Sequence, residues 1–246
     1  MSRAERIEAL LAPEQCALVI LECQRGVIGD LSGLPALADS ARNGMIQTIA
    51  ELARVGREAG VSIIHCIAER RADGRGANTN ARLFQHMRRV ENPLLSGSEA
   101  AGIVSELAVD ERDIVLSRLH GLSPFHGTEL DSILRNLDIQ TLIGVGVSVN
   151  VGVQNFTFDA VNSAYQVVIA RDAVAGFPES YVDAVFEHTL EARHHLALHG
   201  HTHIHRFEKR DNQVFFNPGE CAGHMQGFNA VGVIDLLDLS SELLRF

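Results

Sequence analysis

No stretch of this sequence is apolar over the roughly eighteen residues that a membrane-spanning helix needs. The first fifteen residues, MSRAERIEALLAPEQ, have the pattern of an amphipathic helix and not that of a signal peptide. Positive charge is also scarce, because 21 Lys and Arg stand against 31 Asp and Glu, which gives a net charge of −10. We therefore expect neither a membrane partner nor a nucleic-acid partner.

Cysteine is infrequent, and the four cysteines, Cys16, Cys23, Cys66 and Cys221, lie far apart. Three of them fall in or beside apolar runs, as buried free thiols do. A reduced, cytoplasmic protein is the simplest interpretation. The sequence also lacks internal repeats, and no GxGxxG or GxxxxGKS/T motif follows an apolar run. A nucleotide-binding site therefore has no support.

What the sequence does contain is a series of short apolar runs that alternate with helical patterns. The runs are 17–22, 61–67, 113–117, 141–147 and 167–170, and the helical patterns are 36–59, 128–137, 153–161 and 179–194. Runs of this length suit buried strands, and strands that alternate with helices form parallel sheets. The sequence therefore predicts an α/β fold with a doubly wound, mostly parallel sheet in a Rossmann-like, three-layer arrangement.

The stretch 141–176 has the order strand, helix, strand, with short connections. In parallel sheets of this kind, ligands bind beyond the carboxyl ends of the strands. The loop Ser148–Gly152 lies at such an end, and it also precedes a helix whose first N–H groups lack partners within the helix. We therefore expect the chemistry of the protein to be located at this loop.

The character of the sequence changes after about residue 190. Short apolar runs are separated by Gly, Asn and Pro turns, and six of the twelve histidines lie between His194 and His205. This pattern is typical of a β-meander. We predict a body over residues 1–190 and a C-terminal appendage over residues 191–246.

Four sequence motifs in residues 15 to about 190 resemble the isochorismatase-like hydrolase family, which includes isochorismatases, nicotinamidases and N-carbamoylsarcosine amidases. In chain order they are ALVILECQ, SRLHGLSPFHGTELDSILRNLDIQTLIGVG, GVSVNVGVQNFTFDAV and QVVIARDAVAG. The first resembles the family's opening strand, which normally ends in Asp-x-Gln. The second resembles the segment with its catalytic Lys, the third the loop with its nucleophilic Cys, and the fourth the strand after that loop.

Each of the three catalytic positions that the resemblance implies holds a different residue here. Glu22 stands where the family has Asp, so the carboxylate is kept but moved outward by one methylene. Counting back from Phe125, the position of the Lys falls on Leu119. Arg118 would supply the positive charge if the loop carries a one-residue insertion. Gly152 takes the position of the Cys.

The glycine at position 152 decides which reaction the resemblance implies. Amide hydrolysis through a covalent intermediate needs a nucleophile on this loop. Cys23 is a poor substitute, because adjacent strand residues such as Glu22 and Cys23 point to opposite faces. Isochorismatases proper also carry Gly there and hydrolyse a vinyl ether by protonation. We expect acid/base-assisted hydrolysis of a small anionic molecule without a cysteine nucleophile. The alternative is an inactive module for ligand binding or oligomerisation.

The resemblance also implies a binding site built from backbone groups. A non-proline cis peptide is expected at Val147–Ser148, and the amides of Ser148 and Gly152 would then bind an anion. The candidates that line the pocket are Gln24, His120, Phe125 and Asn150. For two of these residues a structural role is an alternative, helix capping for Asn150 and core packing for Phe125. No cofactor is required, and family members commonly form homo-oligomers.

Residues 196–246 resemble the C-terminal end of a calcineurin-like metallophosphoesterase of the phosphodiesterase type. The sequence Gly-His-Thr-His contains His201 and His203, and these two histidines match a pair of metal ligands in that family. The earlier metal-binding motifs of that family are absent from the chain, so a metal-dependent phosphodiesterase is only the last alternative. Adventitious Zn²⁺ or Ni²⁺ could still bind these histidines.

Overall fold

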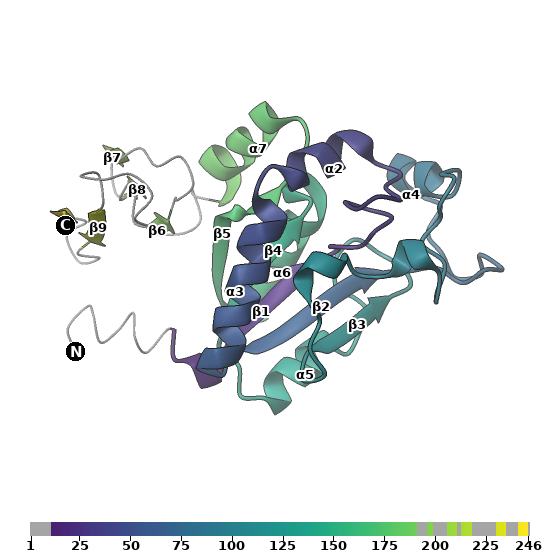
Figure 1. Ribbon diagram of the computed structural model, residues 1–246, viewed down its shortest axis with the longest axis horizontal. Helices are drawn as coiled ribbons and strands as arrows, with labels where there is room; N and C mark the ends of the chain where they lie inside the picture. Colours follow the sequence, from purple (N-terminus) through teal and green to yellow (C-terminus); the bar gives the residue numbers. More distant parts are fainter. Residues whose placement is uncertain are drawn as a thin grey trace.

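A computed structural model describes residues 11–190 in full, together with the backbone of five short strands between residues 196 and 245. The body contains a five-stranded sheet with the order β3-β2-β1-β4-β5 (Figure 1). Its strands are β1 (Cys16–Leu21), β2 (Ser62–Ala68), β3 (Ile114–Arg118), β4 (Thr141–Val147) and β5 (Gln166–Ala175). Every pairing between neighbouring strands is parallel, which confirms the expected α/β fold.

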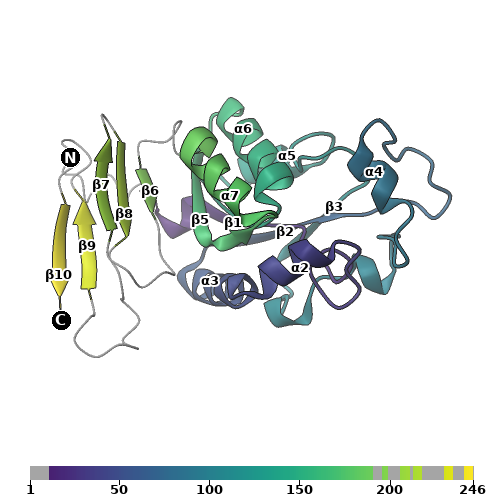
Figure 2. The same cartoon turned by 90° about the horizontal axis from the view of Figure 1, so that it is seen from above.

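Two helical layers cover the sheet. Figure 2 shows α2 and α3 on one face and α5, α6 and α7 on the other, with α4 beyond one end of the sheet. The bounds are α2 (Pro35–Arg42), α3 (Met45–Ala59), α4 (Arg82–Met87), α5 (Leu130–Asn136), α6 (Gln154–Asn162) and α7 (Glu179–Val185). Short helical turns are η1 (Pro13–Gln15), η2 (Glu99–Ala101), η3 (Ser105–Leu107), η4 (Val149–Val153) and η5 (Phe186–Leu190).

The apolar run of β1 explains the three layers. All six of its residues are buried, and alternate side chains enter two different hydrophobic clusters. Val19 and Leu21 pack in the cluster that includes α6, whereas Leu18 and Ile20 pack in the one that includes α3. A parallel strand that is covered on both faces has a continuous apolar sequence, and the run 17–22 is of this kind. The buried strand therefore places its carboxyl end, at Glu22, between the two layers.

Three boundaries differ from the prediction. The helical pattern 36–59 is divided into α2 and α3, because Gly44 adopts a left-handed backbone with φ of 98° at the start of α3. Strand β5 runs five residues beyond the apolar run 167–170, to Ala175, with an irregular register opposite Gly144 and Gly146. The pattern 179–194 forms α7 and then the π-helical turn η5 up to residue 190.

The strands after residue 190 form two small sheets. Their bounds are β6 (Leu196–Leu198), β7 (Arg206–Arg210), β8 (Gln213–Asn217), β9 (Ala230–Ile234) and β10 (Ser241–Arg245). Strands β7 and β8 pair antiparallel, as do β9 and β10, while β6 pairs parallel to β8. His201, His203 and Cys221 lie outside the described residues. None of the helices in the described part of the chain is long and apolar enough to cross a membrane.

The end of β4 lies unusually close to β1, and Gly146 permits this approach. Gly146 has φ of +102°, and a Cβ atom at this position would lie 2.3 Å from the carbonyl oxygen of Leu21. We predict that Gly146→Ala lowers the free energy of unfolding by about 3 kcal/mol or more, because it combines a steric clash with an unfavourable backbone. Urea unfolding at 25 °C measures the change.

Gly74→Ala is the matched control for this prediction. Gly74 also has a positive φ, of +68°, but a Cβ atom there would meet nothing within 4 Å. We expect Gly74→Ala to lower the free energy of unfolding by only about 1 kcal/mol, because only the unfavourable backbone conformation contributes. Equal losses in the two variants would show that the close contact between β1 and β4 does not limit stability.

Candidate active site

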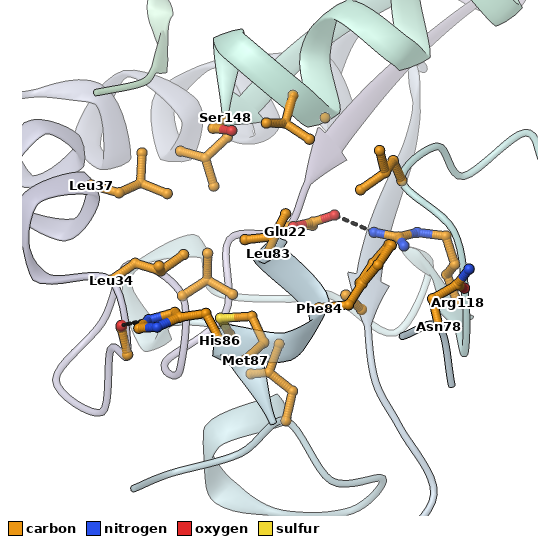
Figure 3. A pocket seen from close by; sticks show the side chains of 18 of the residues that line it. Glu22, Leu34, Leu37, Asn78, Leu83, Phe84, His86, Met87, Arg118 and Ser148 are labelled. Atoms are coloured by element: carbon orange, nitrogen blue, oxygen red, sulfur yellow. Dashed lines mark hydrogen bonds and ion pairs between the residues drawn. The ribbon is translucent and has the colours of Figure 1, made fainter. Parts of the chain in front are cut away.

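A cavity of about 470 Å³ lies at the carboxyl ends of β1, β2, β3 and β4. Glu22 follows β1, Ala68 ends β2, Arg118 ends β3, and Val147 ends β4, and all four residues line the cavity. Figure 3 shows Glu22, Arg118 and Ser148 in this cavity together with apolar side chains from other segments. The position agrees with the general rule that parallel sheets bind ligands beyond the carboxyl ends of their strands.

Glu22 is held by its backbone at the point where β1 ends. Its N–H donates to the carbonyl oxygen of Cys66 at 2.8 Å, and its own carbonyl accepts from the N–H of Gln24 at 2.9 Å. The residue adopts the left-handed region, with φ of 52°, which is uncommon for any residue other than glycine. The side chain is 26% exposed. A residue fixed in this way reaches the cavity with little freedom.

Arg118 forms an ion pair with Glu22 across the end of β2. Its Nη2 donates to Oε1 of Glu22, and its Nη1 donates to the carbonyl oxygens of His120 and Gly121. The side chain of Arg118 is only 8% exposed, whereas residue Leu119 is 43% exposed. The structure therefore brings Arg118, and not Leu119, to the carboxylate.

Burial raises the pKa of the Glu22 carboxyl, while the charge of Arg118 and its hydrogen bond oppose this shift without cancelling it. A raised pKa means that the carboxyl takes up a proton at a higher pH than an ordinary glutamate does. Its protonated form can donate a proton, and its ionised form can accept one.

The loop that follows β4 has the backbone that the resemblance implied. The Val147–Ser148 peptide is cis. The carbonyl oxygen of Ser148 accepts from the N–H groups of Val151 and Val153 at 3.0 Å, within the π-helical turn η4 that leads into α6. The N–H of Ser148 itself has no acceptor among the described residues. It is therefore available to an acceptor atom of a ligand.

Position 152 faces the Glu22 carboxylate. A Cβ atom built at Gly152 would lie 4.0 Å from Oε1 of Glu22 and 3.0 Å from the carbonyl oxygen of Val147. Because glycine has no side chain, the space beside the carboxylate stays open to a ligand or to water. Gly152 also lines the cavity.

Two further candidates from the sequence, His120 and Asn150, also line the cavity. The Nδ2 of Asn150 donates to the carbonyl oxygen of Phe177 at 3.3 Å, and its Oδ1 is buried without a hydrogen-bond partner in the described part of the chain. Asn150 lies inside the turn η4, whose N-cap residue is Ser148, so it does not cap this helical segment.

The lining of the cavity does not include Gln24 or Phe125. Gln24 is fully buried, and its Nε2 donates to the carbonyl oxygens of Ala68 at 2.9 Å and of Ala101 at 2.8 Å. Its Oε1 accepts from the N–H of Ala68 at 2.8 Å. The amide thus completes the backbone hydrogen bonding at the end of β2. Phe125 packs in the core, with ring centroids 5.7 Å from Phe156 and 5.9 Å from Tyr165.

Residues 70–94 contribute a wall of the cavity that was not predicted from the sequence. Arg70 lines the cavity, and its Nε is buried with no hydrogen-bond partner among the described residues. Leu83, Phe84 and Met87 of α4 also line it. The sequence of this segment is typical of a polar surface loop. The one feature that indicates a helix with an apolar face is the spacing of these three residues over one helical turn.

The thiols near the cavity are protonated. Burial raises the pKa of Cys66 to about 12 and raises the pKa of Cys23 further still. The Sγ of Cys23 lies 3.6 Å from the carbonyl oxygen of Leu21 and donates a hydrogen bond to it. Within residues 11–190, no group of three or more His, Cys, Asp or Glu residues could hold a metal ion.

The isochorismatase domain family matches residues 16–196 of the chain. A ureidoacrylate amidohydrolase RutB of Cronobacter sakazakii is 31% identical over 202 residues, covering 74% of this chain and 84% of that protein. An isochorismatase family protein from Desulfovibrio vulgaris has a structure similar to this one, with a TM-score of 0.61 at 26% identity, covering 70% of this chain and 88% of that chain. The structure of a cysteine hydrolase from Pseudomonas syringae is also similar, with a TM-score of 0.59 at 27% identity, covering 68% of this chain and 76% of that chain.

A second similarity is short. A phosphodiesterase of Methanocaldococcus jannaschii is 40% identical over 40 residues, which cover 16% of this chain and 24% of that protein. The chain therefore spans about a quarter of that phosphodiesterase. The two resemblances expected from the sequence are confirmed, the second of them only as a partial match.

The role of Gln24 can be tested by its removal. We predict that Gln24→Ala lowers the free energy of unfolding by about 3 kcal/mol, because it leaves buried groups of Ala68 and Ala101 without partners. The control Gln85→Ala removes an exposed hydrogen bond and should cost less than about 0.5 kcal/mol. Urea unfolding measures both. A stable Gln24→Ala protein that loses ligand binding would instead support the pocket role expected from the sequence.

Proposed function

Because the chain belongs to the isochorismatase family of hydrolases, we propose that it hydrolyses a small anionic molecule by acid/base assistance and without a cysteine nucleophile. The observation that carries the proposal is the ion pair of Glu22 and Arg118 on the cavity wall, with the open position Gly152 beside the carboxylate. Glu22 is the acid and base, and Arg118 holds its carboxyl group in place.

The proposed reaction starts with a protonated Glu22. The carboxyl group donates its proton to the substrate, water adds to the resulting cation, and the proton that this water loses returns to the Glu22 carboxylate. In the hydrated product, the bond to the leaving oxygen then breaks as the added hydroxyl becomes a carbonyl and its proton passes to the leaving oxygen, which departs as an alcohol. The raised pKa of Glu22 supports the first step, because the protonated form is then populated at a higher pH. No covalent enzyme intermediate is formed.

The anionic end of the substrate is proposed to bind at the start of η4. The N–H of Ser148 lacks an acceptor in the described chain, and the amide of Gly152 lies in the first turn of the same helical segment. Arg70 supports an anionic ligand as well, because its Nε is buried without a partner there and Arg118 is already paired with Glu22. His120 and Asn150 complete the proposed substrate-binding set.

The wider setting is also a proposal. We infer a reduced, cytoplasmic homo-oligomer that requires no cofactor. The buried thiols of Cys23 and Cys66, which form no disulfide, support a reducing compartment. Val115 supports an interface, since it is 48% exposed on the edge strand β3. We further propose that residues 191–246 form a β-meander appendage to a 1–190 hydrolase domain. This appendage is inactive as a phosphodiesterase and binds Zn²⁺ or Ni²⁺ only adventitiously, through His201 and His203.

Replacing Glu22 tests the proposed acid. We predict that Glu22→Gln lowers kcat/KM at least about 100-fold in a screen of carboxylated enol ethers, ureido acids and amides, because glutamine cannot transfer the proton. Glu22→Asp keeps the carboxyl and should retain more activity than Glu22→Gln. Wild-type turnover that survives in Glu22→Gln would contradict the assigned role. No turnover of any compound, combined with ligand binding, would favour a module that only binds.

The pH dependence provides a second test of the same group. Because the protonated carboxyl is the proposed active form, kcat/KM should fall as the pH rises through the pKa of Glu22. Since burial raises this pKa, the fall should occur at a higher pH than the value near 4.3 of a free glutamate. The residual activity of Glu22→Gln should not show this fall. An activity that increases over the same range would contradict the role of an acid.

Arg70 tests the preference for an anion. We predict that Arg70→Gln weakens the binding of carboxylates about tenfold or more while leaving the corresponding neutral amides almost unchanged. Arg71→Gln is the matched control, because Arg71 is exposed, pairs with Asp73 and does not line the cavity. Isothermal titration calorimetry measures both ligand series. An equal loss for carboxylates and amides would show that Arg70 does not select charge.

A further inference from the structure

The side of the cavity away from the strand ends is built from apolar side chains. Leu34 and Leu37 come from the start of α2, and Leu83, Phe84 and Met87 come from α4. Figure 3 shows these five side chains around the space in front of Glu22. On α4 they occupy the spacing i, i+1 and i+4, which places them on one face of the helix. The short helix thus presents an apolar face to the cavity.

This wall is attached to the body at several points. The N–H of Arg70 donates to the carbonyl oxygen of Leu94 at 2.8 Å, and the N–H of Ser96 donates to that of Arg70 at 3.0 Å. His86 lies 3.3 Å from the carbonyl oxygen of Gly33. The two backbone hydrogen bonds close residues 70–96 on themselves. The contact of His86 with Gly33 and the hydrogen bond from the N–H of Gly121 to Asn78 hold this segment against the body. The apolar surface is therefore formed before a ligand arrives, which lowers the entropic cost of binding.

Two polar side chains near this wall, Asn78 and Glu69, are already paired within the protein. Oδ1 of Asn78 accepts from the N–H of Gly121 at 2.8 Å, and Oε2 of Glu69 accepts from the hydroxyl of Ser117 at 2.7 Å. The guanidinium of Arg118 is already engaged by the Glu22 carboxyl. The groups that lack partners among the described residues, such as the N–H of Ser148 and the Nε of Arg70, belong to the strand ends. A ligand therefore meets polar groups at one end and hydrocarbon over the rest.

We propose that the substrate of this site carries a hydrocarbon body next to its anionic reacting end, and that the face of α4 with Leu83, Phe84 and Met87 binds that body. This inference rests on the proposed function and names its substrate class. A cavity of about 470 Å³ has room for such a molecule, since pockets of about 300–1,000 Å³ hold organic ligands of moderate size. The free energy gained from burying the body selects it over compact polar molecules.

Two series of probes test the proposal on the full chain. They are straight-chain alkanoates and the matching alkanamides, from three to eight carbon atoms, with binding measured by calorimetry. We expect the Kd to fall about three- to fourfold for each added methylene in both series. Met87→Gln keeps the length and helix propensity of the side chain, and Phe84→Ala removes a ring, so both should flatten this dependence. Tyr181→Ala is the control, because Tyr181 is 50% exposed and does not line the cavity.

The outcomes separate this inference from the proposed function. Affinity that does not depend on chain length, undetectable binding of every probe, or a dependence unchanged in both α4 variants would overturn the hydrocarbon-binding role. If affinity depends on chain length but acids bind no better than amides, the result supports the binding of a hydrocarbon body and contradicts the proposed binding of an anionic end. Thermal unfolding of each variant confirms that the protein is folded during the titration. Because alkanoates contain no bond that this reaction hydrolyses, their series reports binding independently of turnover.

Discussion

The ion pair between Glu22 and Arg118 is the interaction on which the rest of the site depends. The two residues follow or end strands that are not neighbours, because β2 lies between β1 and β3. The register makes their contact possible: Leu21 pairs with Cys66, and Ala68 pairs with Arg118, so both side chains flank the end of β2. A buried guanidinium without its partner would cost several kcal/mol, so Arg118 requires the Glu22 carboxyl. The carbonyl groups of the loop after β3 satisfy the other side of the guanidinium.

The backbone around this pair is strained at Glu22 and is held in place by hydrogen bonds of the Gln24 side chain. A left-handed conformation at Glu22 costs about 1–2 kcal/mol. Two residues further on, the buried side chain of Gln24 makes three hydrogen bonds to Ala68 and Ala101. These bonds attach the strained turn to the end of β2 and to a segment 77 residues away in the sequence. Strain of this kind persists where the surroundings enforce it, which is common at functional sites. The same surroundings fix the direction of the Glu22 carboxyl.

The sequence could predict the strand ends but not every residue around them. Apolar runs located Glu22 and the Ser148–Gly152 loop because a strand buried on both faces leaves a clear pattern. Counting from Phe125 could not decide between Leu119 and Arg118, since the path of the intervening loop depends on hydrogen bonds from the guanidinium itself. The amide of Gln24 was assigned to the pocket because its partners, 44 and 77 residues away, leave no local signal. The apolar face of α4 was missed because a six-residue helix is too short for a reliable period.

The state of the neighbouring thiols decides which kind of hydrolysis this arrangement favours. With a pKa of about 12, Cys66 is a thiolate in only about one molecule in 10⁵ at pH 7, and Cys23 is even less ionised. A covalent route through either sulfur would carry that penalty before any bond formed. For the Glu22 carboxyl, burial raises the pKa and therefore favours the protonated form that acts as the proposed acid. The open space at Gly152 lies next to that carboxyl, where a water molecule or a reacting bond fits and a side chain does not block it. The balance of these protonation costs supports attack by water over attack by sulfur.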